Sequence, residues 1–158
     1  MNKKKWLERW VAAYPEKLRP KRLIGRYRAI NFDWWENVEL HHLKAYWGGE
    51  TAAAKLTKYL KPEFVTIYTT QPIEKLLLNN KIRKDPDGKI EILEAFWYFD
   101  FGGEHNDLVN PILIYADLLA TGDPRNIETT ELIYELWGAQ FSARPYKRYV
   151  ITSFIFIK

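Results

Sequence analysis

The spacing of hydrophobic and polar residues switches repeatedly between a helical period and a strand period along this chain. Apolar residues three or four apart, bounded by capping residues, prolines and glycines, predict helices over residues 4–14, 33–47, 50–60, 72–79, 111–121 and 124–137. Runs rich in β-branched and aromatic residues predict strands over residues 22–30, 63–69, 89–99 and 149–158. This order predicts a single domain of mixed α/β (α+β) class, in which a small central sheet is flanked by helices. The domain is expected to end in a helical hairpin and a C-terminal strand.

The boundaries of the predicted hairpin rest on local chemistry. Asn110 suits the N-cap position and is followed by a proline, whose missing N–H costs nothing in the first turn. Gly122 can end the first helix in the left-handed conformation, and Asp123 with Pro124 then repeats the pattern of cap and proline. The second helix is expected to bury one stripe, made of Ile127, Thr130, Tyr134 and Trp137.

Prolines and glycines also predict where other elements stop. The first helix is expected to pack through Trp10 and Val11 and to end at Pro15. The string DPDG at residues 85–88 predicts a turn before a strand, so its two aspartates are interpreted as part of a β-hairpin.

The hairpin residues also resemble a known family. The string IYADLLATGDPRNIETTELIYE, residues 114–135, resembles a segment of AbiEi-type antitoxins, which belong to type IV toxin–antitoxin systems. Residues 7–29, 47–69 and 90–97 resemble further segments of the same family in the same order. The resemblance therefore covers most of residues 7–137.

The resemblance implies a function in regulation. It implies a non-enzymatic antitoxin and transcriptional regulator that needs no cofactor and counters a nucleotidyltransferase toxin without a stable complex between the two. In such proteins an N-terminal winged-helix domain binds operator DNA. The residues before Leu7 are too few to form that domain, so we expect the chain to correspond to the C-terminal domain alone. Segment 149–158 is not similar to the family.

The matching stretches contain eight residues that are expected to act structurally: Gly48, Gly49, Glu50, Asp117, Gly122, Asp123, Pro124 and Arg125. Asp117 interrupts an apolar helix and needs a partner, so either it or Asp123 is expected to pair with Arg125 or to cap a helix end. Glu50 places a carboxylate where a helix N-terminus would bind phosphate, which favours capping and close packing.

Basic residues concentrate at the N-terminal end. Residues 1–28 contain ten Lys or Arg against two Glu, although the net charge of the chain is only +4. Such a cluster can bind nucleic-acid phosphates, or can be a solvated surface without a partner. The candidate nucleic-acid-binding residues are Lys3, Lys4, Lys5, Arg9, Arg19, Lys21, Arg22, Arg26 and Arg28. The absence of cysteine, of a signal-peptide core and of a long apolar run predicts a cytoplasmic protein that does not contact membranes.

Candidate catalytic patterns are incomplete. A metal-dependent nuclease of the Glu-x-Lys type would use Glu91, but Leu93 stands where lysine is required. A nucleotidyltransferase would need a serine after the glycines at 48–49 and two acids on one strand. Adjacent His41 and His42 point about 100° apart on a helix and cannot share a metal there. We therefore expect no enzyme, cofactor or metal, with a degenerate nuclease and a nucleic-acid-binding module as the alternatives.

Overall fold

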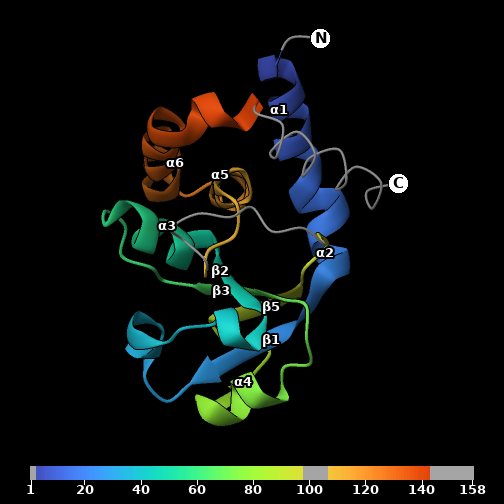
Figure 1. The fold of residues 1–158 in the computed structure, drawn as a ribbon, viewed down its shortest axis with the longest axis vertical. Coiled ribbons are helices and arrows are strands. Elements are labelled where there is room, and N and C mark those ends of the chain that lie inside the picture. Colours follow the sequence, from blue (N-terminus) through green and yellow to red (C-terminus); the bar gives the residue numbers. More distant parts are fainter. Residues whose placement is uncertain (1–2, 98–106, 143–158) are drawn as a thin grey trace.

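The fold is built on a five-stranded sheet (Figure 1). The computed structural model describes residues 3–97 and 107–142. The strands follow the order β2-β3-β5-β1-β4, and only β3 and β5 pair in parallel. Their bounds are Leu23–Ala29 for β1, Ala45–Gly48 for β2, Val65–Thr69 for β3, Ile82–Lys84 for β4 and Ile90–Glu94 for β5.

Helices cover the sheet unequally. The α-helices are α1 (Lys3–Ala13), α2 (Arg19–Arg22), α3 (Gly49–Thr57), α4 (Glu74–Asn79), α5 (Pro111–Ala120) and α6 (Pro124–Trp137). Figure 1 shows α3, α5 and α6 on one side of the sheet, α1 and α2 running down beside them, and α4 on the opposite side. Short 3-10 turns lie at Phe32–Asn37, His41–Leu43 and Gly138–Ser142, and a π-helical turn spans Tyr14–Leu18. The mixed α/β class that the sequence predicts is confirmed.

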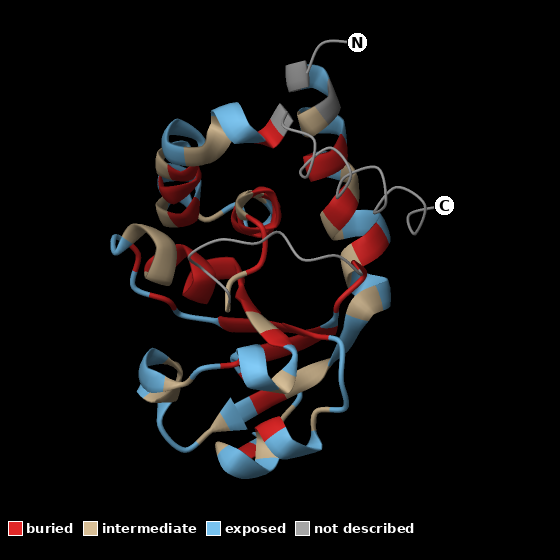
Figure 2. Cartoon of the chain, viewed as in Figure 1, coloured by how far each residue is buried: buried red, intermediate tan, exposed pale blue. Residues whose placement is uncertain are grey.

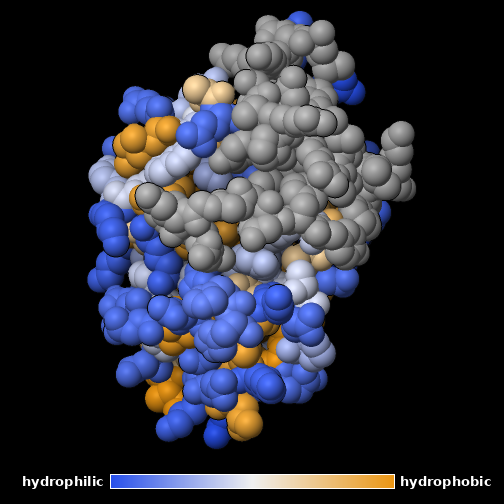
Figure 3. All heavy atoms as spheres, viewed as in Figure 1, coloured by the Kyte–Doolittle hydropathy of each residue, from blue (hydrophilic) through white to orange (hydrophobic). Residues whose placement is uncertain are grey.

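The core lies between the sheet and α5. This helix contacts α1, α3, α6 and β2, and most of its residues are buried (Figure 2). Strand β3 is buried along its whole length, as expected of a strand covered on both faces. The face drawn in Figure 3 is largely hydrophilic outside the residues drawn in grey, with scattered apolar side chains.

The chemistry predicted for the hairpin is confirmed. The Asn110 side chain accepts a hydrogen bond from the backbone N–H of Ile112, and the Asp123 side chain accepts one from the backbone N–H of Arg125, both at 2.9 Å. Gly122 has a φ of +68°, the left-handed conformation that ends α5. Helices and strands near 50–60, 72–79, 22–30 and 63–69 are also present, while segment 149–158 lies outside the described residues.

The buried stripe predicted for α6 is right at Thr130 and Trp137 and wrong at Ile127 and Tyr134. The helix buries Asn126, Thr129, Thr130 and Ile133, whereas Tyr134 is 46% exposed. Polar residues can face the core here because the threonine hydroxyls donate to carbonyls one turn earlier in the same helix, which satisfies them locally. The buried face therefore overlaps the predicted stripe at Thr130 and is rotated from it by less than the turn of about 100° that one residue makes.

The first α-helix ends at Ala13, close to the predicted end at Pro15, but the helical path does not stop there. A π-helical turn spans Tyr14–Leu18, and the backbone N–H of Arg19 donates to the carbonyl of Tyr14. Pro15 lies at the start of this wider turn, where its missing N–H leaves no hydrogen bond broken. The helical path consequently continues from α1 into α2.

The helix predicted over 33–47 is also wrong, because contacts distant in sequence override its spacing. Its end forms β2, which pairs with β3. The backbone N–H of Trp47 also donates to the carbonyl of Asp107 at 2.6 Å. The Asp107 carboxylate accepts from the backbone N–H groups of Leu40 and His41, both at 3.0 Å, and holds that segment in a turn.

The DPDG segment forms a turn, but no β-hairpin. Strands β4 and β5 lie on opposite sides of β1, so the chain must cross β1 between them. A Cβ on Gly88 would lie 2.0 Å from the carbonyl oxygen of Tyr27 in β1, which explains glycine at the crossing. No sequence pattern predicted β4, a strand of three residues.

Candidate functional site

A buried aspartate marks the centre of the molecule. The side chain of Asp117, on α5, is 3% exposed. It accepts a hydrogen bond from Arg19 Nε at 3.0 Å and another from the Tyr68 hydroxyl at 3.0 Å. The Tyr14 hydroxyl lies against that of Tyr68. Since the Tyr68 proton faces Asp117, Tyr14 donates to Tyr68.

The network continues to the sheet surface through Glu91 on β5. Arg19 Nη2 lies 2.6 Å from Glu91 Oε2, and Arg26 Nη2 on β1 lies 2.9 Å from Glu91 Oε1. We call this series the ionic chain, and its members are Tyr14, Tyr68, Asp117, Arg19, Glu91 and Arg26. It joins α2, α5 and three strands through alternating charges.

The π turn before α2 positions Arg19. Each helical residue advances the side-chain direction by about 100°, so the wider turn changes the direction of every residue after it. Arg19 follows the turn directly and reaches both Asp117 and Glu91. The sequence feature that looked like a helix end therefore aims the central arginine at the sheet.

Burial governs protonation in the ionic chain. It raises the pKa of Asp117, while the charge of Arg19 and the hydrogen bond from Tyr68 oppose that rise. Burial, and then the charge of Asp117, raise the pKa of Tyr14 and of Tyr68 well above the ordinary value. Both tyrosines therefore remain protonated hydrogen-bond donors near neutral pH.

The buried tyrosines predict a loss of stability in alkali. An unfolded tyrosine ionises at about pH 10, whereas folded Tyr14 keeps its proton, so folding binds a proton there and the free energy of unfolding falls as pH rises. Tyr14 should contribute a decrease of about 1.4 kcal/mol per pH unit well above pH 10. Urea unfolding between about pH 9 and about pH 12 should show a shallower decrease for Tyr14→Phe than for the unchanged protein. Identical pH dependence in the two proteins would contradict this assignment.

A cavity of about 300 Å³ opens beside the ionic chain. Four members of the chain line one part of it, and Gly49, Glu50, Phe64 and Thr66 line another. Both signs of charge are present, so the cavity suits a polar group with donors and acceptors better than a bare anion. Within residues 3–97 and 107–142, no group of three or more His, Asp or Glu side chains could hold a metal ion.

Gly49, which lines this cavity, is held by close packing. Gly49 has a φ of +52°, and a Cβ there would lie 2.7 Å from Thr66 Oγ1. The following carboxylate, of Glu50, is buried and lies 2.6 Å from Arg125 Nη2. The expected close packing is confirmed, but no side-chain hydrogen bond caps the start of α3 at Gly48, and Glu50 binds Arg125 instead.

The prediction that Asp117 or Asp123 pairs with Arg125 or caps a helix end is confirmed through Asp123. Asp123 caps α6 and lies 3.7 Å from Arg125 Nη2, as expected. Asp117 instead binds Arg19, 98 positions earlier in the sequence. The orientation of α5 decides this, since Asp117 faces the sheet. The isolated charge in an apolar helix did indicate a partner, but nothing local indicated which one.

The nine basic candidates separate into groups with different surroundings. Lys3 and Lys4 lie in α1, and their side chains are outside the described part. Three arginines contact carboxylates: Arg19, Arg26 and Arg22, the last at 3.6 Å from Glu94. The exposed members are Lys5, Arg9, Lys21 and Arg28. Nucleic-acid binding by this set stays a prediction.

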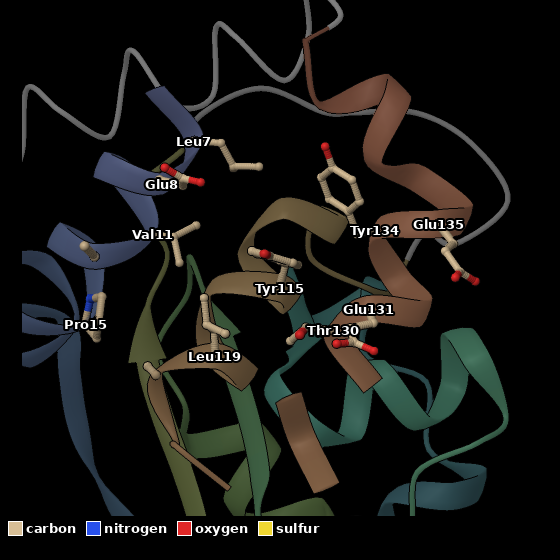
Figure 4. A pocket seen from close by; sticks show the side chains of 12 residues that line it. Leu7, Glu8, Val11, Pro15, Tyr115, Leu119, Thr130, Glu131, Tyr134 and Glu135 are labelled. Carbon is tan, nitrogen blue, oxygen red and sulfur yellow. The ribbon is translucent and has the colours of Figure 1, made fainter. Parts of the chain in front are cut away.

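A second hollow, of about 650 Å³, lies between α1, α5 and α6 (Figure 4). Leu7, Val11 and Leu119 give it apolar walls, and Tyr115 and Tyr134 project into it from α5 and α6. Its acidic members are Glu8, Glu131 and Glu135. These carboxylates disfavour phosphate binding in this hollow. No sequence pattern predicted the hollow itself.

Comparison with known families supplies the identity. A family model described as a transcriptional regulator, AbiEi antitoxin of a type IV toxin–antitoxin system, matches residues 1–137. The chain belongs to this family. The match runs from α1 to the end of α6 and so contains the whole ionic chain.

The family resemblance inferred from the four sequence stretches is thereby confirmed. No curated protein matches the chain, and no solved structure does. Among the residues that the structure describes, no helix is both long and apolar enough to cross a membrane.

Proposed function

We propose that this chain is the antitoxin module that counters a nucleotidyltransferase toxin in the cytoplasm, and that it does so without catalysis. The observation that carries the proposal is the family match, which spans the described fold to the end of α6. Family membership supplies the antitoxin role, and the type of toxin follows from what the resemblance implies.

The charge arrangement around Glu91 favours regulation over catalysis. A two-metal or one-metal nuclease needs carboxylates that are open to cations. Glu91 is instead shared by Arg19 and Arg26, and Asp117 is bound by Arg19 and Tyr68. These carboxylates have the surroundings of a structural network, with each charge compensated by protein donors.

A growth assay tests the antitoxin role. Induction of a nucleotidyltransferase toxin of a type IV system should arrest growth, and co-expression of the chain should restore it. Glu91→Gln keeps the size of the side chain and an amide oxygen that can accept from Arg19, so the variant should preserve protection while it remains folded by circular dichroism, because a non-catalytic antitoxin needs no carboxylate for chemistry there.

Two results would go against the proposal. Unrelieved arrest, with the chain present in folded form by circular dichroism, would remove the antitoxin role. Loss of protection in Glu91→Gln, together with Mg²⁺-dependent nucleic-acid cleavage by the unchanged protein, would favour the degenerate nuclease. The matched control for Glu91→Gln is Tyr14→Phe, which changes another member of the ionic chain but retains its arginines and carboxylates.

A second candidate function is nucleic-acid binding through the basic N-terminal face. The exposed positions of Lys5 and Arg9 on α1 favour it. Nucleic-acid binding by Lys5→Gln with Arg9→Gln tests this face, and comparison with variants of a second basic surface separates the two.

A further inference from the structure

Three cations line up across the sheet, away from the basic N-terminal helix. Arg28 on β1 is the direct cross-strand partner of Arg83 on β4, so both side chains lie on the same face. Lys89 precedes β5 by one residue and Glu91 by two, which places it on the face of Glu91. All three cations are exposed, and we call them the basic ledge.

The basic ledge destabilises the fold. Like charges directly opposite each other on antiparallel strands destabilise the pair. A charged edge strand resists pairing with other chains, which accounts for Arg83 on β4. It does not account for Arg28, because β1 lies inside the sheet between β5 and β4. No salt bridge is found for either arginine among the residues that the structure describes.

An aromatic side chain adjoins the ledge at the cavity. Phe64 directly precedes β3, is 37% exposed and lines the cavity beside Arg26 and Glu91. The backbone N–H of Val65 donates to the carbonyl of Lys89 at 2.9 Å, which brings the segment of Phe64 next to that of Lys89. An accessible ring therefore stands beside a row of cations.

We propose that the basic ledge and Phe64 bind single-stranded nucleic acid. Phosphates contact Arg28, Arg83 and Lys89, and a base stacks on Phe64 at the mouth of the cavity. Cations that follow a backbone and an aromatic ring that accepts an unpaired base are the two elements of single-strand recognition. Three strand spacings separate β3 from β4, about 14 Å, so the surface can contact several successive nucleotides.

Nearby acidic residues limit where the phosphates of a bound strand can lie. Glu63 precedes Phe64 and would repel a phosphate on that side, so the ring receives a base and the phosphates stay over β1 and β4. Glu91 is already bound by two arginines. This surface contains none of the residues that are changed in the antitoxin growth assay. Single-strand binding here does not depend on the antitoxin role.

Fluorescence anisotropy of the full chain tests this site. The probes are labelled oligouridine, oligothymidine and a duplex, each of about 12 nucleotides, within the length that single-strand-binding folds cover. Arg28→Gln with Arg83→Gln should weaken binding of both single strands at least about tenfold and reduce the salt slope by about 1.4, which corresponds to two lost phosphate contacts. Phe64→Ala should weaken binding by about tenfold and leave the salt slope unchanged.

The matched control removes the same charge elsewhere. Lys61→Gln with Lys75→Gln replaces two exposed lysines outside β1, β4 and β5 and should leave the affinity within about twofold. The variant Arg28→Gln with Arg83→Gln, the ledge variant, should also unfold at the same or a higher urea concentration than the unchanged protein, because the repulsion between two like charges is removed. Reduced affinity with preserved stability distinguishes a binding role from a structural one.

The controls also define what overturns the proposal. It fails if no probe binds at low salt, if the duplex binds more tightly than the single strands, or if the matched control loses as much affinity as the ledge variant. It also fails if Lys5→Gln with Arg9→Gln on α1 loses more affinity than the ledge variant, since the basic N-terminal face is then the binding surface.

Discussion

Replacing Arg19 with methionine should lower the free energy of unfolding by about 3–5 kcal/mol, the largest effect expected for a single substitution. Methionine fills much of the same space, so the change isolates the loss of charge. Asp117 would lose its cation while its side chain stays 3% exposed, and Glu91 would lose one of two. Burial already raises the pKa of Asp117, and only Tyr68 would still oppose that rise. Urea unfolding near neutral pH measures the difference.

Arg26→Met is the matched control for this prediction. Arg26 also binds Glu91, but its side chain is 41% exposed and water screens the pair, so the loss should be about 1 kcal/mol or less. Adding Asp117→Asn to Arg19→Met should recover part of the stability, because it removes the unpaired charge. Equal losses for Arg19→Met and Arg26→Met would show that Arg19 is not the centre of the ionic chain.

Gly49→Ala should lower the free energy of unfolding by about 2–5 kcal/mol. Two costs add at this position. An alanine at a φ of +52° has the strain of the left-handed conformation, about 1–2 kcal/mol. Its Cβ would also lie 2.7 Å from Thr66 Oγ1 and 3.1 Å from Thr66 Cβ, and overpacking costs about 1–3 kcal/mol.

Gly122→Ala separates the two costs. Gly122 has a similar φ of +68°, but nothing lies within 4 Å of a Cβ built there, so only the conformational cost of about 1–2 kcal/mol remains. Thr66→Ala combined with Gly49→Ala should recover part of the stability, since the nearest atom is then absent. If Gly49→Ala and Gly122→Ala cost the same, the β2–α3 turn does not depend on the close approach to β3.

Local rules predicted the parts of the fold whose causes lie within a few residues. Asn110 and Asp123 cap their helices, and Gly122 takes the left-handed conformation, because each of these roles depends on adjacent backbone groups. The same rules located the end of α1 but failed to predict the π turn that continues the helical path past Pro15. They failed again at Trp47, whose strand partners lie in β3 and beside Leu108.

The candidate site was less predictable than the fold. Asp117 stood out in the sequence, since a charge in an apolar helix needs a partner. Arg19 was assigned to a basic surface, because sequence alone gives no reason to bring together residues 98 positions apart. Tyr14 and Tyr68 had no distinguishing pattern, as buried tyrosines are ordinary core residues.

The sequence by itself determined the class of the fold, the hairpin with its caps and the family, because these follow from residue order and from interactions between near neighbours. Only the tertiary structure decided the ionic chain, the crossing of β1 by the segment at Gly88, and the alignment of Arg28 with Arg83. Each of these depends on strand register and helix orientation. Those are set by burial of the whole core and by hydrogen bonds between distant segments, which no local pattern contains.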